Sequence, residues 1–508
     1  MKVEVKRKRN ILVAAAITLG ANLLFFLMVF LVSRYDNISL DQLLYQKQTS
    51  ISGTNSDFAA SAVMTVGGLG TLAALLEMAA YWLLSGAAKS RLPAWKRYAK
   101  YCAGKTCRFF SRRALPLSLL LLLVACVSFA ARLEVFSYVG HRVTESDFIE
   151  DNYADPSQVK LTFPEQKRNL VYIYLESMEN TFAQSGVCET ITDDYIPELT
   201  QLAQAHINFS HTAGVGGALS YDGTTWTAAA LVTQTSGVPI KVSLTEEKYG
   251  EEDVYMPGVV TLGDILQEQG YQQVFIMGSN AEFANRDAYF TTHGNYELLD
   301  TNALKAAGRL EEDYEQWWGY EDEKLFAYAK EELTRLAGTG EPFNLTVLTA
   351  DSHFPDGYVC RLCPQTYEEQ YANVLRCSAT QIYEFITWVQ AQPFYENTTI
   401  VLCGDHLTMD PEFLKDIDEN YVRTVYNCII NAPVVPTWEK ERQFGTFDMF
   451  PTTLAALGVQ IEGDRLGLGT NLFGDIQTLT EKYGYETLND ELQKKSQYYD
   501  TKFFGKEE

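Results

Sequence analysis

The chain has 508 residues, of which 46% are hydrophobic and 21% are charged. This composition excludes a largely disordered protein, and the length exceeds what one compact core usually holds. The formal net charge of −24 is unevenly distributed, because residues 1–132 hold 17 Lys and Arg against 5 Asp and Glu. Residues 133–508 hold the other 24 basic and 60 acidic side chains. So acidic a region repels polyanions, which argues against nucleic acid as a partner.

Three apolar segments precede the acidic region, at residues 11–33, 58–84 and 114–131. The first two reach the ~20 residues that a helix needs to cross a ~30 Å hydrocarbon layer, and the third lies at the short end of the range. The first is too long for the apolar part of a signal peptide, and no small-residue cleavage site follows it. We therefore predict three transmembrane helices, with two as the alternative.

The charges beside these segments predict an orientation. The N-terminal end is basic, and the loop between the second and third segments carries nine Lys and Arg over residues 89–113 without an acidic residue. The loop between the first two segments is mildly acidic. Basic loops stay in the cytoplasm, so three spans put the chain after about residue 133 outside the membrane. We expect a multi-pass cell-membrane protein with an extracytoplasmic domain.

The expected organisation is a membrane region over residues 1–132, a connector over residues 133–168 and an extracytoplasmic catalytic domain over residues 169–508. In the last region, short apolar runs alternate with helical stretches such as residues 320–337 and 367–390. This alternation favours an α/β fold with a mainly parallel sheet flanked by helices. The expected strands are residues 169–175, 273–277, 344–348, 398–402 and 425–430.

Carboxylates follow three of the expected strands. Glu176 follows one strand, Asp351 and His353 follow another, and Asp405 and His406 follow a third. Ligands of such sheets bind beyond the carboxyl ends of the strands. A buried carboxylate is costly unless it is paired or metal-bound, and mixed oxygen and nitrogen ligands suit Mn, Mg or Zn. Each cluster alone could be a helix cap or a surface pair, but three at strand ends favour a metal site.

A glycine-containing loop leads into an apolar helical stretch over residues 216–232, and it carries Thr224 and Thr227. The start of a helix presents backbone N–H groups and the positive end of the helix dipole. A threonine hydroxyl there could attack a phosphorus atom. An ordinary helix cap is the alternative for an isolated threonine.

Several motifs occur in one order over nearly 300 residues. They are NLVYIYLESMENTF (169–182), INFSHT (207–212), GTTWTAAALVTQTSGVP (223–239), WGYEDEKLF (318–326), DSHFPDG (351–357), CGDHLTM (403–409) and DMFPTTLAALG (448–458). With them the chain resembles the lipoteichoic acid synthase and phosphoglycerol transferase branch of the alkaline phosphatase/sulfatase superfamily. Within that branch it is most similar to enzymes that decorate periplasmic glucans with phosphoglycerol.

The resemblance implies an alkaline phosphatase/sulfatase-like fold and a site for one divalent metal ion, manganese with magnesium or zinc as alternatives. It implies that Glu176, the nucleophilic threonine, Asp405 and His406 bind this ion. It also implies that His353 lies near the leaving group or the phosphate and that Arg286 grips the phosphate of the substrate.

Both threonines remain candidates for the nucleophile. Thr227 is favoured, because the ten-residue spacing to Gly237 is that of sulfatase-type sequences, whereas Thr224 follows a glycine as in the lipoteichoic acid synthase motif. Two positions depart from the family: Ala284 and Met277 stand where lipoteichoic acid synthases carry a tryptophan and a histidine.

The implied activity is transfer of glycerol phosphate from phosphatidylglycerol, or a similar phospholipid, through a metal-activated threonine. The acceptor is an envelope molecule: a glycolipid, a glycerol-phosphate chain or a glucan. Phosphoethanolamine transfer, sulfate ester hydrolysis and phosphodiester hydrolysis are alternatives on the same scaffold, and a non-enzymatic envelope sensor is another. A sulfatase is disfavoured because the Cys/Ser-x-Pro-x-Arg context is missing, and a sensor because every proposed metal ligand is present.

Cys360 and Cys363 form an isolated C-x-x-C motif after the His353 segment. One pair cannot complete a four-thiolate zinc site. A local disulfide and two free thiols are therefore the open alternatives for this motif.

Overall fold

The computed structural model of the chain describes residues 2–35, 38–84, 96–184, 186, 188, 191–242, 255–415, 417–418 and 420–505. Contacts divide the chain into two compact units. One comprises residues 1–40 and 55–138, and the other comprises residues 41–54 and 139–508.

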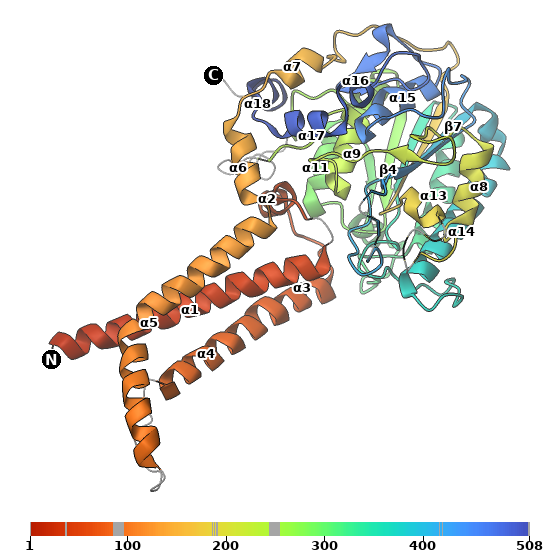
Figure 1. Cartoon of the computed structure of the whole chain (residues 1–508). Coiled ribbons are helices and arrows are strands. Elements are labelled where there is room, and N and C mark those ends of the chain that lie inside the picture. The colour runs from red at the N-terminus through yellow and green to blue at the C-terminus, as the bar shows by residue number, and fades with distance from the viewer. Residues whose placement is uncertain are drawn as a thin grey trace. The chain divides into compact units, whose positions relative to one another are not determined.

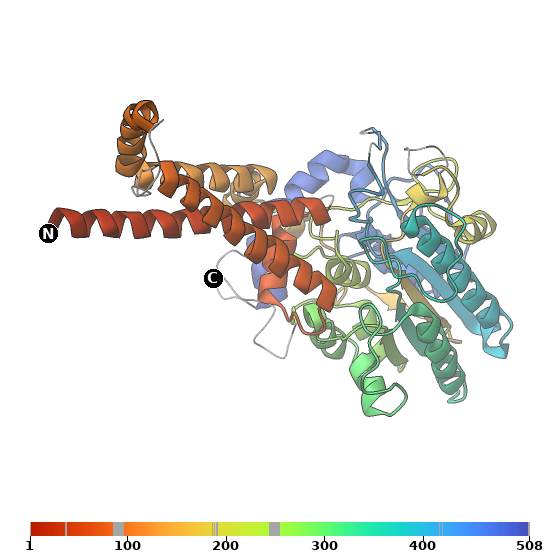
Figure 2. The same cartoon turned by 90° about the horizontal axis from the view of Figure 1, so that it is seen from below.

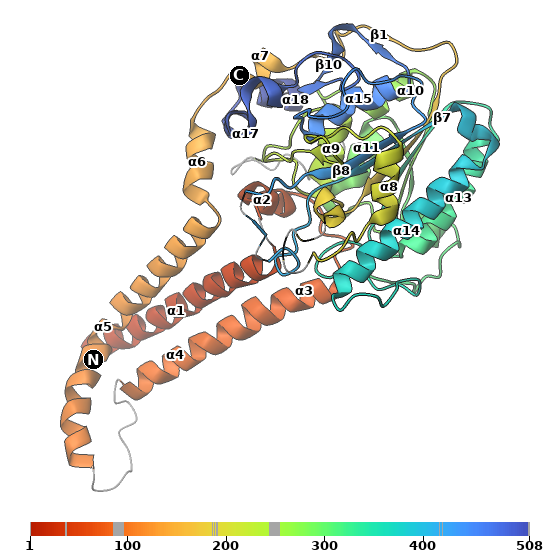
Figure 3. The same ribbon diagram turned by 45° about the vertical axis from the view of Figure 1, so that its right-hand side comes forward.

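The first unit is built from long apolar helices (Figures 1, 2 and 3). Three stretches are long and apolar enough to cross a membrane, at Asn10–Arg34, Ser56–Tyr81 and Arg113–Arg132, which confirms the three apolar segments predicted from the sequence. The helices are α1 (Lys2–Arg34), α3 (Ser56–Ala62), the π-helix η1 (Val63–Leu69), α4 (Gly70–Leu84) and α5 (Lys96–Arg132). Residues 89–95 of the predicted basic loop lie outside the described residues, and residues 96–113 belong to α5.

The helices of this unit expose apolar side chains, as helices in a lipid bilayer do. Leu72, Leu75 and Leu120 are exposed on the helices, as expected for surfaces that face lipid rather than water. Glu77 in the second span accepts a hydrogen bond of 2.9 Å from Asn22 of the first. Such pairing lowers the cost of an ionisable group inside a membrane.

The second unit is built on a seven-stranded sheet with the order β3-β8-β7-β2-β6-β4-β5. The strands are β2 (Asn169–Leu175), β3 (Gly217–Ala218), β4 (Gln272–Met277), β5 (Glu297–Leu299), β6 (Phe343–Leu348), β7 (Thr398–Gly404) and β8 (Val425–Ile430). Five of them, β2 and β4 to β7, are parallel. Every residue of β2, β6, β7 and β8 is buried, which explains their near-continuous apolar sequences.

The five predicted strands all occur, and their bounds agree to within two residues. One strand differs in direction: β8 runs antiparallel to β7. The described residues between β7 and β8 contain no helix. A parallel neighbour would need a long crossover connection, usually a helix, so the chain returns antiparallel here.

Helices cover both faces of the sheet (Figures 1 and 3). One face packs against α8 (Pro197–Ala205), α13 (Asp322–Ala337) and α14 (Gln370–Gln390). The other carries α9 (Thr227–Ser236), α10 (Leu262–Glu268), α11 (Arg286–Thr292) and α15 (Met449–Ala456). This is the mainly parallel, helix-flanked α/β fold predicted from the sequence.

Smaller elements complete the second unit. Two of them, α2 (Leu40–Gln48) and α6 (Val135–Val143), begin with residues of the first unit. The others are α7 (Phe148–Asn152), α12 (Thr301–Ala306), α16 (Leu479–Tyr483), α17 (Tyr485–Gln493), α18 (Gln497–Phe504), and the strand pairs β1 (Leu161–Thr162) with β9 (Gln460–Ile461) and β10 (Arg465–Leu466) with β11 (Gly469–Thr470). The segment before β2 packs against the C-terminal helices, where Ser146 donates a hydrogen bond of 2.6 Å to Glu491 and Lys502 lies 2.7 Å from Asp155.

Candidate active site

The carboxyl ends of β2 and β7 bring three predicted metal ligands together. These strands are parallel neighbours with Leu175 opposite Gly404, so Glu176 and Asp405 emerge side by side at the same edge. Donor atoms of Glu176, Asp405 and His406 lie within 4.8 Å of one another, and all three side chains are buried. We call these three residues the acidic cluster.

Hydrogen bonds from neighbouring groups orient the ligand atoms of the acidic cluster. The Ser177 hydroxyl donates to Glu176 Oε1 (2.7 Å), and the Ser177 backbone N–H donates to Asp405 Oδ1 (2.8 Å). His406 Nδ1 lies 2.8 Å from the Leu407 carbonyl oxygen and therefore carries the proton, so that the lone pair of Nε2 faces the carboxylates. Nε2 is 3.4 Å from Asp405 Oδ2 and 3.6 Å from Glu176 Oε1.

The acidic cluster has the charge of a cation site. Burial, reinforced by Glu176, raises the pKa of Asp405 to about 7. Burial alone would lower the pKa of His406, but Asp405 and Glu176 hold it above its ordinary value. Among the described residues, the buried Asp405 Oδ2 has no hydrogen-bond partner. Two carboxylates and one imidazole fit a divalent ion such as manganese, magnesium or zinc, which would satisfy this atom.

Thr227 adds a hydroxyl to the acidic cluster. It is the first residue of α9, and its Oγ1 lies 3.4 Å from Glu176 Oε2 and 3.4 Å from His406 Nε2. The helix ends at Gly237, whose φ of +69° lies in the left-handed region that glycine adopts without strain. The spacing noted in the sequence is therefore the length of this helix.

Thr224 has a different environment. Its hydroxyl donates to the Tyr221 carbonyl oxygen (2.8 Å) and accepts from the Tyr221 backbone N–H (2.9 Å). The side chain is fully buried and closes the turn before α9. The structure thus gives the two threonines different partners: Thr227 faces the acidic cluster, and Thr224 holds the loop.

Arg286 begins α11 and is buried, with Nη2 donating to Ser279 Oγ (3.0 Å) and the Asn280 carbonyl oxygen (2.7 Å). Burial lowers its pKa to about 10, and Glu176 is the strongest opposing influence. The guanidinium stays protonated at neutral pH, within the electrostatic reach of the acidic cluster. Its described hydrogen bonds use Nε and Nη2 and none of them uses Nη1.

His353 is half-buried and neutral. Burial lowers its pKa to about 4, and Nδ1 lies 2.6 Å from the Phe354 carbonyl oxygen, so Nε2 is the acceptor nitrogen. Its ring centroid lies 4.8 Å from that of Trp318. Asp405 and His406 both influence its pKa, which places it near the acidic cluster.

The third carboxylate predicted at a strand end has another role. Asp351 accepts a hydrogen bond from the Asp322 backbone N–H (3.2 Å), and Asp322 accepts from the backbone N–H groups of Ala350 (2.8 Å) and Asp351 (3.2 Å). Asp351 therefore joins the strand end to the start of α13. The group of possible metal ligands at this edge of the sheet contains Glu176, Asp405 and His406 without it.

Sequence reasoning missed the segment Asp41–Thr54, which lies between the first two apolar spans but belongs to the second unit. The Ala284 backbone N–H donates to the Ser50 carbonyl oxygen (2.9 Å), and the Ser50 backbone N–H donates to Asn285 Oδ1 (2.8 Å). Tyr45 donates to the Ala284 carbonyl oxygen (2.8 Å), and its ring centroid lies 5.6 Å from that of Trp226. No local sequence pattern in this segment predicts these contacts.

The parallel sheet, with a threonine at a helix start facing carboxylates and an imidazole, defines an α/β protein of the alkaline phosphatase-like class. The Sulfatase family model matches residues 168–459, more than half of the chain, and the chain belongs to this family.

A curated relative, phosphoglycerol transferase I from Citrobacter koseri, is 31% identical over 341 residues, which cover 65% of this chain and 42% of the relative. The chain thus spans less than half the length of that relative. Two solved structures are similar. The lipoteichoic acid synthase LtaP from Listeria monocytogenes has a TM-score of 0.48 and 18% identity, over 64% of this chain and 81% of that one. The lipooligosaccharide phosphoethanolamine transferase A (EptA) from Neisseria meningitidis has a TM-score of 0.48 and 14% identity, over 89% of this chain and 84% of that one.

Proposed function

We propose that this protein is a membrane-anchored phosphoglycerol transferase, which moves glycerol phosphate from phosphatidylglycerol or a similar phospholipid to a cell-envelope acceptor. The observation that carries the proposal is the position of Thr227 Oγ1, 3.4 Å from Glu176 and from His406 in a buried acidic cluster. The name of the curated relatives, phosphoglycerol transferase I, supports the identity of the transferred group.

Glu176, Thr227, Asp405 and His406 would hold one divalent ion, with manganese favoured and magnesium or zinc as alternatives. When bound, such an ion supplies positive charge that favours the alkoxide form of threonine and offsets the charge of the phosphate. The residues of the chain supply the rest of the chemistry.

Thr227 Oγ1 attacks the phosphorus atom of the donor. The hydroxyl of Thr227 gives up its proton to water as the new O–P bond forms, the bond from phosphorus to the diacylglycerol oxygen breaks, and that oxygen takes up a proton from water and leaves as free diacylglycerol. The product is a glycerophosphoryl diester on Thr227. Arg286 pairs with the phosphate through Nη1, and the acceptor nitrogen of neutral His353 binds a hydroxyl of the leaving or entering alcohol.

An acceptor hydroxyl then attacks the same phosphorus atom. Its proton is released to water, the O–P bond to the acceptor forms, the bond from phosphorus to Thr227 Oγ1 breaks, and Oγ1 takes up a proton from water. A glycolipid, a glycerol-phosphate chain and a glucan all offer such a hydroxyl. Thr224 supports this sequence indirectly, because its hydrogen bonds to Tyr221 hold the loop that precedes Thr227.

Membrane attachment suits a lipid donor. Three apolar helices over residues 1–132 would keep the domain at residues 169–508, joined through residues 133–168, at the bilayer that contains the donor. Attachment raises the effective concentration of the donor without adding contacts. In the proposed orientation that domain is extracytoplasmic, so a reporter active only in the cytoplasm should be silent when fused after residue 140. A strong reporter signal would reverse the orientation.

The activity is tested with the purified full chain in lipid nanodiscs that contain headgroup-labelled phosphatidylglycerol. The expected products are diacylglycerol and a labelled acceptor, and both should disappear in Thr227→Ala. Parallel reactions with phosphatidylethanolamine, a sulfate ester and a simple phosphodiester test the alternatives. Faster turnover of any of these, or no turnover of any substrate, would contradict the proposal.

A further inference from the structure

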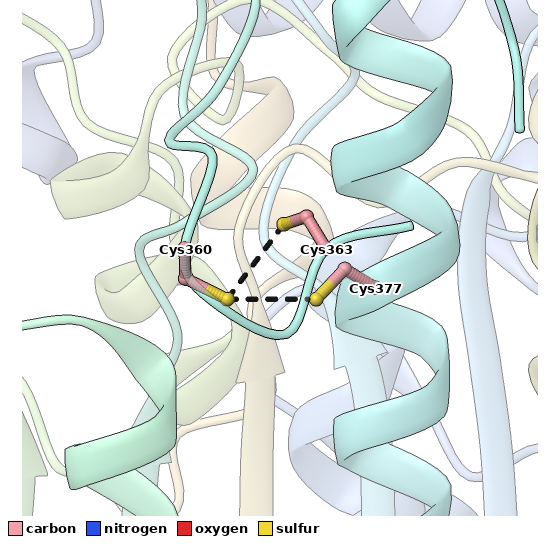
Figure 4. Close-up of side chains that lie close together, drawn as sticks. All are labelled: Cys360, Cys363 and Cys377. Carbon is pink, nitrogen blue, oxygen red and sulfur yellow. Dashed lines mark hydrogen bonds between the residues drawn. The ribbon is translucent and has the colours of Figure 1, made fainter. Parts of the chain in front are cut away.

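Three thiols meet beside the loop that carries His353 (Figure 4). Cys360 Sγ lies 3.6 Å from Cys363 Sγ and 3.6 Å from Cys377 Sγ. The three sulfurs lie within 4.8 Å of one another. Cys360 and Cys363 belong to the loop after β6, whereas Cys377 comes from α14. The C-x-x-C pair seen in the sequence is therefore two-thirds of a larger site.

The sulfur separations fit three ligands around one ion. Metal–sulfur bonds of ~2.3 Å at tetrahedral angles hold two thiolates about 3.8 Å apart. Both measured separations from Cys360, 3.6 Å, are close to this value. A disulfide would instead join two sulfurs at ~2.0 Å and leave the third thiol beside it. Unlike a disulfide, a bound metal ion would use all three sulfurs as ligands.

The surroundings favour a thiolate at Cys360. The Leu362 backbone N–H donates to its Sγ (3.4 Å), and the Gln381 side-chain amide donates to Cys377 Sγ (3.4 Å). Donors directed at a sulfur stabilise its charged form, which is the form that binds metals.

We propose that Cys360, Cys363 and Cys377 bind one thiophilic metal ion, with zinc as the best fit, and leave the fourth position to water or an outside ligand. This site is separate from the acidic cluster. The ion would join the loop after β6 to α14. A hydrogen bond already connects the two, because Tyr371 of α14 donates to the Ser352 carbonyl oxygen of the loop (2.8 Å). The site would thereby fix the segment that contains His353.

The test uses the full chain, purified in detergent under reducing conditions and loaded with cobalt as a spectroscopic substitute for zinc. We expect a thiolate-to-cobalt charge-transfer band in the near ultraviolet, lost in Cys377→Ser and kept in the matched control Cys188→Ser. Elemental analysis of zinc-loaded protein should show one equivalent lost in Cys377→Ser. Asp405→Ala should retain that equivalent and the cobalt band.

Two results would overturn the metal site. One is a disulfide among these three cysteines, detected by peptide mass spectrometry of protein purified without reductant. The other is a cobalt-loaded wild-type protein without the charge-transfer band. The wild-type spectrum decides the question even if Cys377→Ser fails to fold.

A second, independent observation concerns the turn before Arg286. Ala284 and Asn285 have φ values of +58° and +56°, a left-handed conformation that is strained for residues other than glycine. Ser50 bonds to both residues, and Tyr45 bonds to the carbonyl oxygen of Ala284. Tyr45 is 1% exposed, so these bonds are shielded from water.

We infer that Tyr45 and Ser50 are positioning residues, which hold this turn so that Arg286 can bind the phosphate of the substrate. The inference rests on the proposed function. Because residues 41–54 join the first two apolar spans, it makes a membrane-proximal loop part of the catalytic unit. The segment also contacts Trp226, the residue directly before Thr227.

The test compares Tyr45→Phe with Tyr255→Phe in the full chain. Both remove the 2.8 Å hydrogen bond between the two hydroxyls, but only Tyr45→Phe removes the bond to Ala284. We expect Tyr45→Phe to raise the KM for the donor about fivefold with little change in kcat, since about 1 kcal/mol is lost. It should also speed hydrogen exchange of the Ala284 amide. Tyr255→Phe should change neither.

Equal KM values for the two variants would overturn the positioning role, as would faster exchange at Ala284 without a change in KM. A wild-type protein without transferase activity would instead contradict the proposed function. In that case glycerol 3-phosphate binding by calorimetry replaces KM, and equal affinities of the two variants would still overturn the role of Tyr45.

Discussion

Two buried carboxylates that lie three residues apart after β2 have opposite environments. Glu179 is completely buried and receives hydrogen bonds from Arg423 Nη2 (2.6 Å) and Nε (3.0 Å). It also accepts from the Thr408 backbone N–H (2.9 Å). Glu176 is 3% exposed, yet its ionisable neighbours in the acidic cluster are Asp405 and His406.

The difference separates structural charge from charge that serves a ligand. A buried ion pair with its hydrogen bonds satisfied needs nothing further, and Glu179 fits this description. Glu176 and Asp405 concentrate negative charge beside the Thr227 hydroxyl, which is costly unless a cation compensates it. Removing a charge from the acidic cluster should therefore lower activity, whereas removing one from the Glu179–Arg423 pair should lower the stability of the fold.

The largest effect is expected from Asp405→Ala. Loss of this carboxylate should reduce turnover by about 10⁴-fold, because the nucleophile loses its activating environment. The melting temperature of the metal-free protein should stay equal or rise, since a buried unpaired charge is gone. Assays of turnover, metal content and thermal unfolding on one preparation measure all three. An Asp405→Ala protein with wild-type activity and normal metal content would contradict the metal assignment.

Next in size is the contrast between the two threonines. Thr227→Ala should lower the rate by several orders of magnitude without unfolding the protein, because it removes the attacking oxygen. Thr224→Ala should keep measurable activity but cost about 1–3 kcal/mol of stability, since the Tyr221 N–H loses its buried partner. Transfer rates and denaturant unfolding of both variants test this contrast. An active Thr227→Ala protein would show that Thr227 is not the nucleophile.

The ion pair of Glu179 and Arg423 should contribute to the stability of the fold. Arg423→Ala leaves Glu179 buried without its counter-charge and should destabilise the protein by about 3–5 kcal/mol. Metal affinity of the folded fraction should be unchanged, because the acidic cluster is untouched. Urea unfolding and metal titration measure the two properties. A loss of metal without a loss of stability would show that the two carboxylates are not distinct in role.

The smallest expected effect is a pH dependence from His353. Its folded-state pKa of about 4 lies below the ordinary 6.5, so the unfolded chain binds the extra proton first. The free energy of unfolding should fall as pH drops from about 6.5 toward 4, by at most about 3 kcal/mol. His353→Gln should flatten this slope in unfolding curves measured at several pH values. An identical slope in this variant would mean that another group titrates.

The fold was largely predictable because its signals are local. Five strands, three apolar spans and the length of α9 appear as runs and spacings in the sequence. The placement of Glu176 beside Asp405 also followed, since parallel strands end at one edge of a sheet. The proposed roles of Arg286 and His353 come from the family resemblance, because no spacing in the sequence indicates them.

Contacts between distant segments were not predictable. Ser50 and Tyr45 lie more than two hundred residues before Ala284, in a loop whose composition suggested only a connection between spans. Cys377 joins the C-x-x-C pair only because α14 packs beside the loop after β6. The antiparallel direction of β8 depended on a return connection without a helix, which apolar patterns do not reveal.

Mass spectrometry of the trapped enzyme shows whether Thr227 carries the transferred group. The full chain is incubated with phosphatidylglycerol and manganese without an acceptor, quenched in acid and digested. We expect a glycerophosphoryl adduct on Thr227 that is absent from Thr227→Ala and present in Thr224→Ala. An adduct on Thr224, or one that persists in Thr227→Ala, would contradict it.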